Sequence, residues 1–324
     1  MSTTLRLYDA DSVIHSITPV FEAYWRFARA RFDLWERRAN QRNDLSSCDP
    51  ILERYRFTNS YRVLDRVSQY LIGEVQNSEV TEFAIEDIVF RTLLFKIFNK
   101  IDTWELIRDQ LGSVVRHNRL VFQEVERILG KARSSSATIY SSAYIMPSPK
   151  FGKVFKHENH ISMLKFIMEE KLDDLRRATS LKDLYLALLS VPGLGPFLAF
   201  QYATDLNYSY HFCFSESDFV VAGPGAHDGL SKCFTAYSKK SAEQVILATC
   251  EQQDMWFEHY GVEPVRLNGR KLQPIDCQNL FCEISKYSRV SHPHIEGIAK
   301  RKRIKQVYKR SVRPLPQLRL PACW

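Results

Sequence analysis

Apolar residues recur at helical spacing along most of the chain, and this pattern predicts a protein built almost entirely of α-helices. Residues 17–41 are the clearest case, because apolar positions alternate with charged ones at the three- and four-residue spacing of one helix face. The same spacing predicts further helices at residues 61–75, 85–99, 104–111, 118–132, 159–177, 181–190, 196–206, 242–260 and 274–287.

Two polar or proline-containing stretches interrupt this pattern near the middle of the chain. They are the serine run at 134–136 and the segment 147–153, where prolines and a glycine disfavour a helix. With 324 residues the chain is long enough for two lobes. We therefore expect an N-terminal helical lobe at 1–150, a second helical lobe at 151–299 and a C-terminal tail at 300–324.

The stretch from Ser190 to Phe200 gives the strongest indication of chemistry in the sequence. It contains an apolar-Pro-Gly-apolar-Gly turn that opens a helix. Glycines let a phosphate approach the backbone closely, and the helix N-terminus adds partial positive charge. An ordinary glycine turn between two helices is the competing explanation. We expect Val191, Gly193 and Gly195 to contact DNA.

A polar stripe follows several aromatic residues near position 60. If residues 60–71 form a helix, four polar side chains share one of its faces. A solvated face held by Asp–Arg ion pairs would explain the stripe as well. The aromatic residues favour the wall of a polar cleft, since rings beside arginines suit a base and its phosphates. The candidate pocket residues here are Arg56, Asn59, Tyr61, Arg62, Asp65 and Arg66.

Two further segments add candidates to such a wall. Asn99 ends the predicted helix 85–99, and a helix-capping role would also explain it. In the predicted helix 274–287, an amide, a carboxylate, an ammonium and a phenol share one face, which a salt-bridged surface helix would also explain. These four residues are Asn279, Glu283, Lys286 and Tyr287.

Positive charge is concentrated at the C-terminal end. The formal net charge is +8, yet the residues before Lys300 carry slightly more acidic than basic side chains. We expect the proline-containing tail to run along a DNA backbone and to make binding depend on salt, although a localising tail would share its composition. Its candidate DNA contacts are Lys300, Arg301, Lys302 and Arg303.

Composition adds expectations about compartment and cofactors. No apolar run reaches the roughly eighteen residues that span a bilayer, so we expect a cytoplasmic protein without membrane contact, and a monomer. The seven cysteines are odd in number and include no Cys-x-x-Cys pair, which favours reduced thiols. The histidines lack metal-binding spacing, so we expect no metal and no cofactor.

The order of motifs resembles the helix-hairpin-helix DNA glycosylases. In that family the hairpin is followed by a helix and then by an aspartate beside apolar residues, a place that Asp218 takes here. The resemblance implies that Asp218 stabilises positive charge at C1′ of a flipped nucleotide, with Asp228 as the competing catalytic carboxylate. A turn carboxylate that bonds its own backbone would account for Asp228 more readily. Phe197 stands where strand-cleaving members carry a lysine, which implies base removal alone.

A narrower resemblance rests on four segments. They are Tyr-Arg-Phe-Thr-Asn-x-Tyr-Arg-x-x-Asp-Arg at 55–66, Leu-Phe-Lys-Ile-Phe-Asn at 94–99, Phe-Val-Val-Ala-Gly-Pro-Gly-Ala at 219–226 and Asp-Cys-Gln-Asn-x-x-Cys-Glu at 276–283. They look like the α-glutamyl/putrescinyl-thymine pyrophosphorylase group, which overlaps the helical domain of 5-hydroxymethyluracil DNA kinases. This resemblance spans residues 50–290. It implies an all-α, helix-hairpin-helix DNA glycosylase-like fold, two helical lobes with a cleft, acting on modified DNA.

From this resemblance we expect a DNA glycosylase that excises a hypermodified base from phage DNA as an anti-phage defence. The alternative is a transferase that displaces pyrophosphate from an activated 5-hydroxymethyl pyrimidine with an amine or amino acid. In that case arginines and Lys286 would hold the leaving group. A DNA-binding module that uses only the hairpin and the tail is the third possibility.

Overall fold

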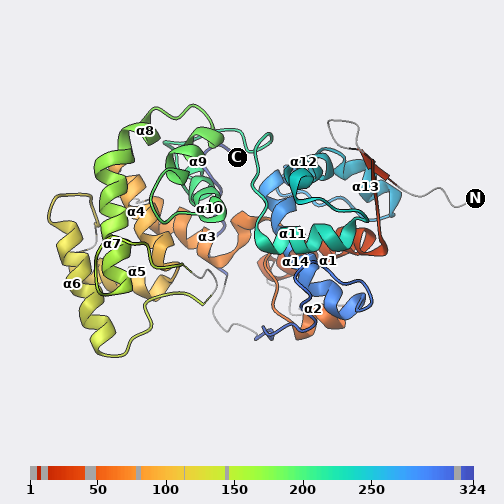
Figure 1. Ribbon diagram of the computed structural model, residues 1–324, viewed down its shortest axis with the longest axis horizontal. Helices are drawn as coiled ribbons and strands as arrows, with labels where there is room; N and C mark the ends of the chain where they lie inside the picture. Colours follow the sequence, from red (N-terminus) through yellow and green to blue (C-terminus); the bar gives the residue numbers. More distant parts are fainter. Residues whose placement is uncertain are drawn as a thin grey trace, which may run out of the picture. The chain divides into compact units, whose positions relative to one another are not determined.

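The protein is mostly α-helical, as the sequence pattern predicts, and the all-α fold class is confirmed (Figure 1). The computed structural model describes residues 6–8, 14–40, 49–77, 82–112, 114–142, 146–309 and 315–324. Within these ranges the strands are Arg6–Tyr8 (β1) and Ile14–Ser16 (β2), which pair antiparallel. No helix in the same ranges is both long and apolar enough to cross a bilayer.

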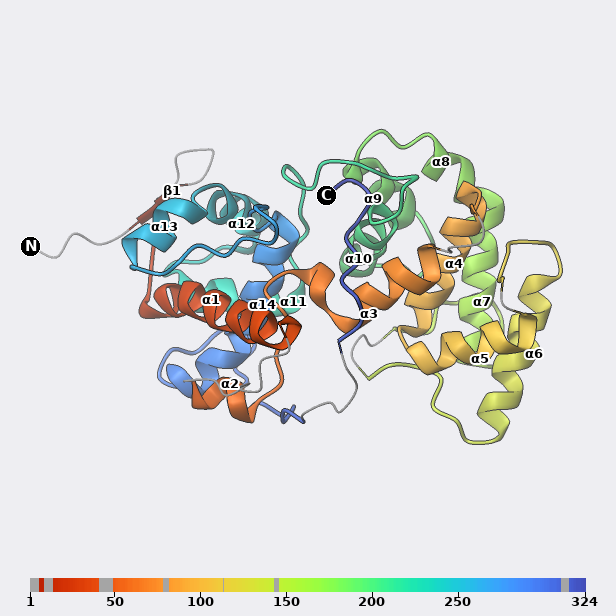
Figure 2. The ribbon, with the colours of Figure 1, turned by 180° about the vertical axis from the view of Figure 1, so that it is seen from behind.

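The chain forms two compact units. Unit 1 comprises residues 1–65 and 216–315, and unit 2 comprises residues 66–215 and 316–324. This division differs from the lobes expected at 1–150 and 151–299 with a tail at 300–324. The stretches at 134–136 and 147–153 lie inside unit 2, because a surface loop between packed helices is as polar as a linker between domains. Figure 2 shows the helices of each unit from behind.

Unit 1 is built on two long helices, α1 (Pro19–Ala39) and α14 (Pro274–Ser291). The hydroxyl of Thr18 accepts a hydrogen bond from the main-chain N–H of Val20 and so caps the start of α1. The inner face of α1 is aromatic, and the rings of Tyr24 and Phe281 lie 4.6 Å apart between their centres. The other helices are α2 (Pro50–Arg54), η1 (Arg62–Leu64), α11 (Pro224–Cys233), η4 (Lys239–Ser241), α12 (Ala242–Glu251) and α13 (Gln253–His259).

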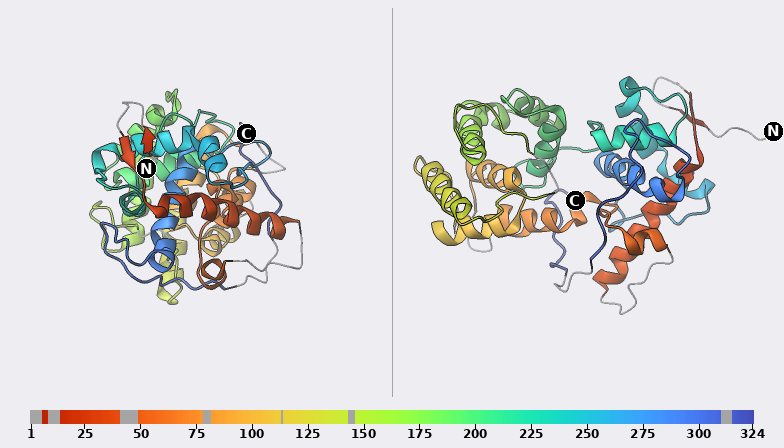
Figure 3. Two further views of the ribbon diagram at one scale, coloured as in Figure 1. Left: turned by 90° about the vertical axis from the view of Figure 1, so that its right-hand side faces the viewer. Right: turned by 60° about the horizontal axis from the view of Figure 1, so that its bottom comes forward.

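Helices α11 and α14 approach each other more closely than any residue but glycine allows. Both helices belong to unit 1, which Figure 3 shows in two further views. A Cβ atom on Gly229 would lie 1.9 Å from the carbonyl oxygen of Phe281, and one on Gly225 would lie 2.2 Å from Sγ of Cys282. The Gly-Pro-Gly-Ala segment at 223–226 therefore serves the packing of one helix on another.

Unit 2 surrounds the buried helix α4 (Ile85–Phe98). Helix α4 contains one arginine, Arg91, whose side chain is buried. Its guanidinium donates to the carbonyl oxygens of Val75 and Val115, each at 2.6 Å. The other helices are α3 (Arg66–Tyr70), the π-helix η2 (Leu71–Gln76), α5 (Ile101–Leu111), α6 (Val121–Ser134), α7 (Lys156–Phe166), the π-helix η3 (Ile167–Lys171), α8 (Leu172–Arg176), α9 (Leu181–Leu189) and α10 (Pro196–Asn207).

Two of the helices predicted from the sequence are interrupted, and helices α2 and α11 lie outside every predicted range. Residues 61–75 do not form one helix, because Tyr61 and Asp65 are extended on either side of η1. The predicted helix 242–260 is interrupted at Gln252, between the end of α12 at Glu251 and the start of α13 at Gln253. Helix α11 contains Pro224, Gly225 and Gly229, which disfavour a helix in the sequence pattern.

The C-terminal segment of unit 2 is fixed in two ways. Gln69 exchanges two hydrogen bonds with the main chain of Arg319, at 2.9 and 2.8 Å. Cys213 and Cys323 form a disulfide with Cα atoms 5.6 Å apart. The expectation of reduced thiols is therefore wrong for this pair, which the fold brings together across 110 residues of sequence. Cys48 lies outside the described residues.

His160 of α7 links two irregular segments in the interior of unit 2. Its Nε2–H donates to the carbonyl oxygen of Pro147 at 2.9 Å, and its Nδ1 accepts from the hydroxyl of Tyr140 at 2.6 Å. The carbonyl can only accept, so the ring is the neutral Nε2–H tautomer. Burial lowers the pKa of His160 to about 4.

Replacing Gly229 with alanine should destabilise the protein by about 2–4 kcal/mol, because the new methyl group would collide with the backbone of α14. Gly195→Ala is the matched control, since a Cβ there meets no atom within 4 Å. Urea denaturation of both variants measures the difference. Equal stability of the two would contradict the close approach of α11 to α14.

The free energy of unfolding should fall as pH drops from about 6.5 toward 4, by up to roughly 2 kcal/mol from His160 alone. The unfolded chain binds a proton at this residue in that range, whereas the lowered pKa of His160 keeps it neutral in the folded state. His160→Gln retains a donor for Pro147 but cannot titrate. Denaturation at pH 7 and 4.5 should show that the variant loses less free energy of unfolding than wild type. Equal losses in the two proteins would refute this role of His160.

Candidate functional site

The residues expected to form a site belong to both units. In unit 1 the structure brings the segment 55–65 against helix α14, through main-chain hydrogen bonds to α14 side chains. Unit 1 holds Arg56, Asn59, Tyr61, Arg62, Asp65, Asp218, Asp228, Asn279, Glu283, Lys286, Tyr287, Lys300, Arg301, Lys302 and Arg303, and unit 2 holds Arg66, Asn99, Val191, Gly193 and Gly195.

A partly exposed group of polar side chains in unit 1 is centred on Asn59. The main-chain N–H and Nδ2 of Asn59 donate to Oδ1 of Asp65 at 3.0 and 3.2 Å. Its Oδ1 accepts from Nη2 of Arg31 at 2.6 Å, so the amide is fixed in orientation. Glu283 and Lys286 of α14 add a second carboxylate and a second positive charge to this group. We call these five residues the Asn59 cluster: Arg31, Asn59, Asp65, Glu283 and Lys286.

The α14 side of this cluster rests on aromatic rings. Oε2 of Glu283 accepts from Nζ of Lys286 at 2.6 Å and from the main-chain N–H of Thr58 at 3.3 Å. Nζ of Lys286 lies 5.3 Å from the ring centre of Phe57. The hydroxyl of Tyr287 donates to Oδ2 of Asp49 at 2.7 Å, and the Tyr287 ring lies 6.1 Å from the ring of Phe57 between their centres.

Asp65 is the group in the cluster best suited to proton transfer. Burial raises the pKa of Asp65 to about 6, while the N–H of Asn59 and the charge of Arg31 act in the opposite direction. Its Oδ2 accepts no hydrogen bond from any described residue. A carboxylate that titrates near neutral pH and has an open oxygen can accept the proton of a substrate hydroxyl.

Tyr61 and Arg62 hold the fold of unit 1 together. The hydroxyl of Tyr61 donates to the carbonyl oxygen of Arg270 at 2.5 Å and accepts from the N–H of Leu267 at 3.1 Å. The main-chain N–H of Arg62 donates to Asp276 at 2.7 Å. Burial raises the pKa of Asp276 to about 7. Tyr61 is fully buried, so these contacts explain its place in the sequence.

The two aspartates considered for catalysis lie in different surroundings. Asp218 is exposed in the loop that precedes α11. Asp228 is buried, and its carboxylate accepts from the main-chain N–H of Ala299 at 2.7 Å and from the hydroxyl of Ser285 at 2.5 Å. Asp228 therefore fastens a distant loop and α14 to α11 rather than bonding its own turn.

The glycine turn of unit 2 joins α9 to α10. Val191 and Leu194 are buried, whereas Gly193 and Gly195 are exposed. Gly193 has φ +90°, and a Cβ there would lie 2.6 Å from Cβ of Pro149. Gly195 is the N-cap of α10 and has no side chain to occupy the N–H groups of the first turn. Contact between this turn and DNA stays a prediction.

Asn99 belongs to a buried network that joins α4 to α10. It adopts a left-handed conformation at the end of α4, and its Oδ1 accepts from Nζ of Lys96 at 2.8 Å. Nζ of Lys96 also lies 3.4 Å from Oδ2 of Asp205 on α10. A small cavity of about 10 Å³, room for one water molecule, adjoins the network and is lined by Lys96, Met146, Leu198, Gln201 and Tyr202.

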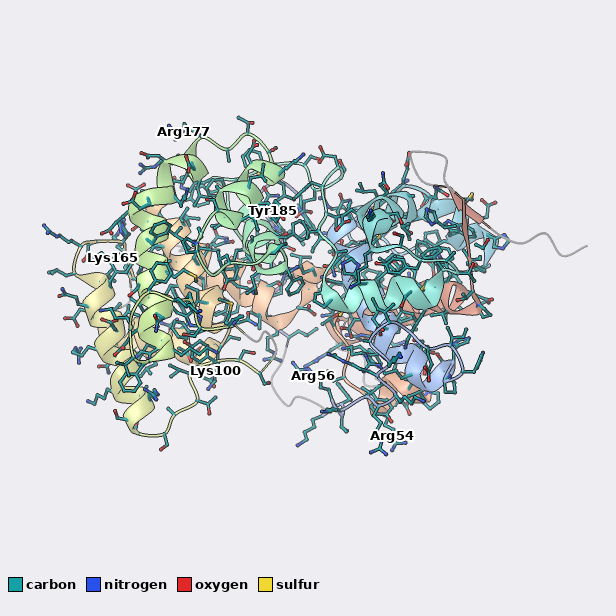
Figure 4. All side chains as sticks on the ribbon, viewed as in Figure 1. Arg54, Arg56, Lys100, Lys165, Arg177 and Tyr185 are labelled. Atoms are coloured by element: carbon teal, nitrogen blue, oxygen red, sulfur yellow. A yellow bond between two sulfur atoms is a disulfide. The ribbon has the colours of Figure 1, made fainter. Side chains whose placement is uncertain are left out.

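The basic tail is extended and lies partly against unit 1. The main-chain N–H of Arg56 donates to Gln306 at 2.9 Å, and the carbonyl of Arg303 accepts from Arg289 at 3.0 Å. Arg56, labelled in Figure 4, keeps its side chain exposed beside the tail. The tail side chains from Lys300 to Arg303 are also exposed, while residues 310–314 lie outside the described residues.

Arg31 is a cluster member that sequence reasoning missed. It lies in the middle of the amphipathic pattern of α1, where a charged residue on the polar face needs no special explanation. Arg31 is far from residues 55–65 in the sequence, so no local pattern could predict that they are in contact. In the described parts of the chain, no three His, Cys, Asp or Glu side chains gather where they could hold a metal ion.

Comparisons with known proteins bear on both the family and the activity. A sequence model of the family described as "5-hmdU DNA kinase, helical domain" matches residues 18–297. A protein of Bacillus phage SP10 named "5-hmdU DNA kinase" is 23% identical over 278 residues, which cover 79% of this chain and 43% of that protein. The chain thus spans less than half the length of this relative. No solved structure matches the chain.

These matches overturn the expected activity. Both the family and the phage relative are named for a DNA kinase, which transfers a phosphoryl group and neither cleaves a glycosidic bond nor displaces pyrophosphate. The glycosylase and hydrolase assignment was therefore wrong, and so was the pyrophosphate-displacing transferase. The glycine turn and the motif order misled because they indicate DNA contact, which several chemistries share.

The family match extends from before α1 to beyond the end of α14 and includes all four segments on which the narrower resemblance rests. This span is most of the chain and takes in helices of both units. The chain belongs to the family of 5-hmdU DNA kinase helical domains.

Proposed function

We propose that this chain binds DNA containing 5-hydroxymethyluracil and holds the modified base for phosphorylation of its hydroxymethyl oxygen. The observation that carries the proposal is the family match over residues 18–297, within which the Asn59 cluster lies entirely. The name of the phage relative supplies the substrate class. The sequence contains no Gly-x-x-x-x-Gly-Lys-Ser/Thr stretch, and we assign none of its residues to the phosphoryl donor.

The Asn59 cluster is the site proposed for the modified base. A base turned out of the duplex is recognised by hydrogen bonds to its edge and by stacking on apolar rings. Oδ2 of Asp65 is the acceptor proposed for the hydroxyl of the 5-hydroxymethyl group, because Oδ1 is occupied by Asn59. In phosphoryl transfer to a hydroxyl, a carboxylate in this position takes up the proton. Arg31 and Lys286 supply positive charge for the product phosphate.

The glycine turn between α9 and α10 is the proposed contact with the DNA backbone. Exposed Gly193 and Gly195 allow a phosphate to approach, and the open N-terminus of α10 favours negative charge. Contacts of this kind position the duplex without reading its sequence. The exposed basic residues of the tail, Lys300 to Arg303, add affinity that salt weakens.

Wild-type protein should bind a duplex containing one 5-hydroxymethyluracil roughly tenfold more tightly than its thymine counterpart at pH 7.5, through a hydrogen bond to ionised Asp65. The preference should shrink at pH 5, because Asp65 with a pKa of about 6 is then mostly protonated. Asp65→Asn keeps an acceptor for Asn59 but has no charge, so its preference should be small at both pH values. Fluorescence anisotropy measures the affinity of both proteins for both duplexes at both pH values.

The thymine duplex is the internal control, since Asp65→Asn should leave that affinity unchanged. Equal wild-type affinity for the two duplexes at both pH values would overturn the proposed function. A wild-type preference that Asp65→Asn retains in full would instead remove Asp65 from the site.

Placing an aspartate at Gly195 should lower DNA affinity about tenfold without loss of stability. Asp is a favourable N-cap residue, and its carboxylate would occupy the N–H groups of α10 and repel a phosphate. Gly195→Asn caps the helix equally well without the charge and should bind DNA close to wild-type affinity. Thermal denaturation and anisotropy test both. Unchanged DNA affinity in Gly195→Asp would show that the turn does not contact DNA.

A further inference from the structure

The surface loop at residues 147–156 of unit 2 has a composition suited to a polyanion. It carries Lys150, Lys153 and Lys156 and no acidic residue. Lys150 and Lys153 are exposed, and the guanidinium of Arg133 lies 4.0 Å from the ring centre of Phe155 within the same surface. Four positive charges therefore gather on and beside this loop.

The loop is held in one conformation by a buried amide. Oδ1 of Asn159 accepts from the main-chain N–H groups of Phe151 and Lys153 at 2.9 and 3.2 Å. Its Nδ2 donates to the carbonyl oxygens of Lys153 and Phe155 at 2.8 and 2.9 Å. Gly152, with φ +76°, makes the turn between them. All four bonding positions of one side chain are spent on the backbone of the loop.

At the tip of this fixed loop, Val154 is 88% exposed. Burying a valine side chain contributes about 1.5–3 kcal/mol to stability. Val154 is exposed and therefore does not make this contribution to the fold. Ordering the loop around it also costs conformational entropy. An exposed apolar side chain on a fixed loop between lysines is the arrangement by which proteins insert a side chain between the bases of a duplex.

The loop lies against the glycine turn already assigned to the DNA backbone. Pro149 packs on Gly193 so closely that a Cβ on the glycine would lie 2.6 Å from Cβ of the proline. His160 fixes the start of the same loop through Pro147. The loop that carries the lysines and Val154 therefore packs against the glycine turn within unit 2.

We propose that this surface binds double-stranded DNA and that Val154 inserts between neighbouring bases. The inference rests on the proposed function and deepens it by naming the element that opens the duplex. Apolar side chains inserted at a base step unstack it at a cost of a few kcal/mol, which phosphate contacts on either side offset. Lys150 and Lys153 flank Val154 and supply those contacts. Unstacking lowers the cost of turning the modified base out of the helix.

The test uses full-length protein and a duplex with 2-aminopurine next to the 5-hydroxymethyluracil, since this base fluoresces more strongly when unstacked. Wild type should raise the fluorescence several-fold. Val154→Ser should abolish the rise and weaken binding by about three- to thirtyfold, whereas Val154→Leu should preserve both. Leu120→Ser is the matched control, because Leu120 is an apolar residue that is 65% exposed elsewhere in unit 2. This variant should bind the duplex and raise the fluorescence as wild type does.

The outcomes separate this inference from the proposed function. A Val154→Ser protein that binds the duplex and unstacks 2-aminopurine like wild type would overturn the insertion, even if the preference for 5-hydroxymethyluracil remains. If wild type shows no preference for 5-hydroxymethyluracil over thymine, the proposed function is overturned. A rise in fluorescence with both the 5-hydroxymethyluracil and the thymine duplex would in that case still support the insertion. A change of oligomeric state in Val154→Ser, measured by analytical ultracentrifugation, would identify a second copy of the chain as the partner instead.

Discussion

Helix α14 can organise unit 1 because α11 lies against its backbone at a distance that only glycine permits. Gly229 faces the carbonyl of Phe281 and Gly225 faces Cys282, so the two helices act as one platform. Their contact leaves the remaining faces of α14 to the aromatic side of α1 and to the segment 55–65. Helix interfaces with small residues allow such approach, and any larger residue would force the helices apart.

Buried side chains bonded to main-chain groups position the irregular segments of both units. The carboxylate of Asp276 accepts a hydrogen bond from the main-chain N–H of Arg62, and that of Asp228 accepts one from the N–H of Ala299. Asn159 does the same for the loop beside the glycine turn. Such bonds satisfy polar groups that would otherwise be buried without partners, and they fix loops that have no regular hydrogen-bonding pattern. The residues proposed to bind DNA and the modified base all lie in or beside segments held this way.

The proposed function joins two kinds of surface with different physical demands. Base recognition needs a fixed, partly desolvated group of donors and acceptors, and in the Asn59 cluster burial raises the pKa of Asp65 to about 6. Backbone recognition needs accessible N–H groups and positive charge, which the glycine turn and its neighbouring loop provide. The family match includes both surfaces.

The amino-acid sequence by itself determined the helical class, the positions of most helices and the glycine turn, because these depend on periodicity and local backbone preferences. It also marked 55–66 and 276–287 as polar segments with shared chemistry. It could not distinguish among activities that all contact DNA, so the inferred glycosylase was wrong.

Tertiary structure decided which of the marked residues meet. Arg31 joins Asn59 across 28 residues, and Cys213 joins Cys323 across 110, distances over which no local pattern carries information. The stripe at 60–71 is interrupted because the main-chain N–H of Arg62 donates to Asp276 of α14, and this long-range contact outweighs the helical preference of the stripe. A pattern along the chain specifies which face of an element is apolar, whereas only the packed fold specifies which polar groups lose water and must find one another.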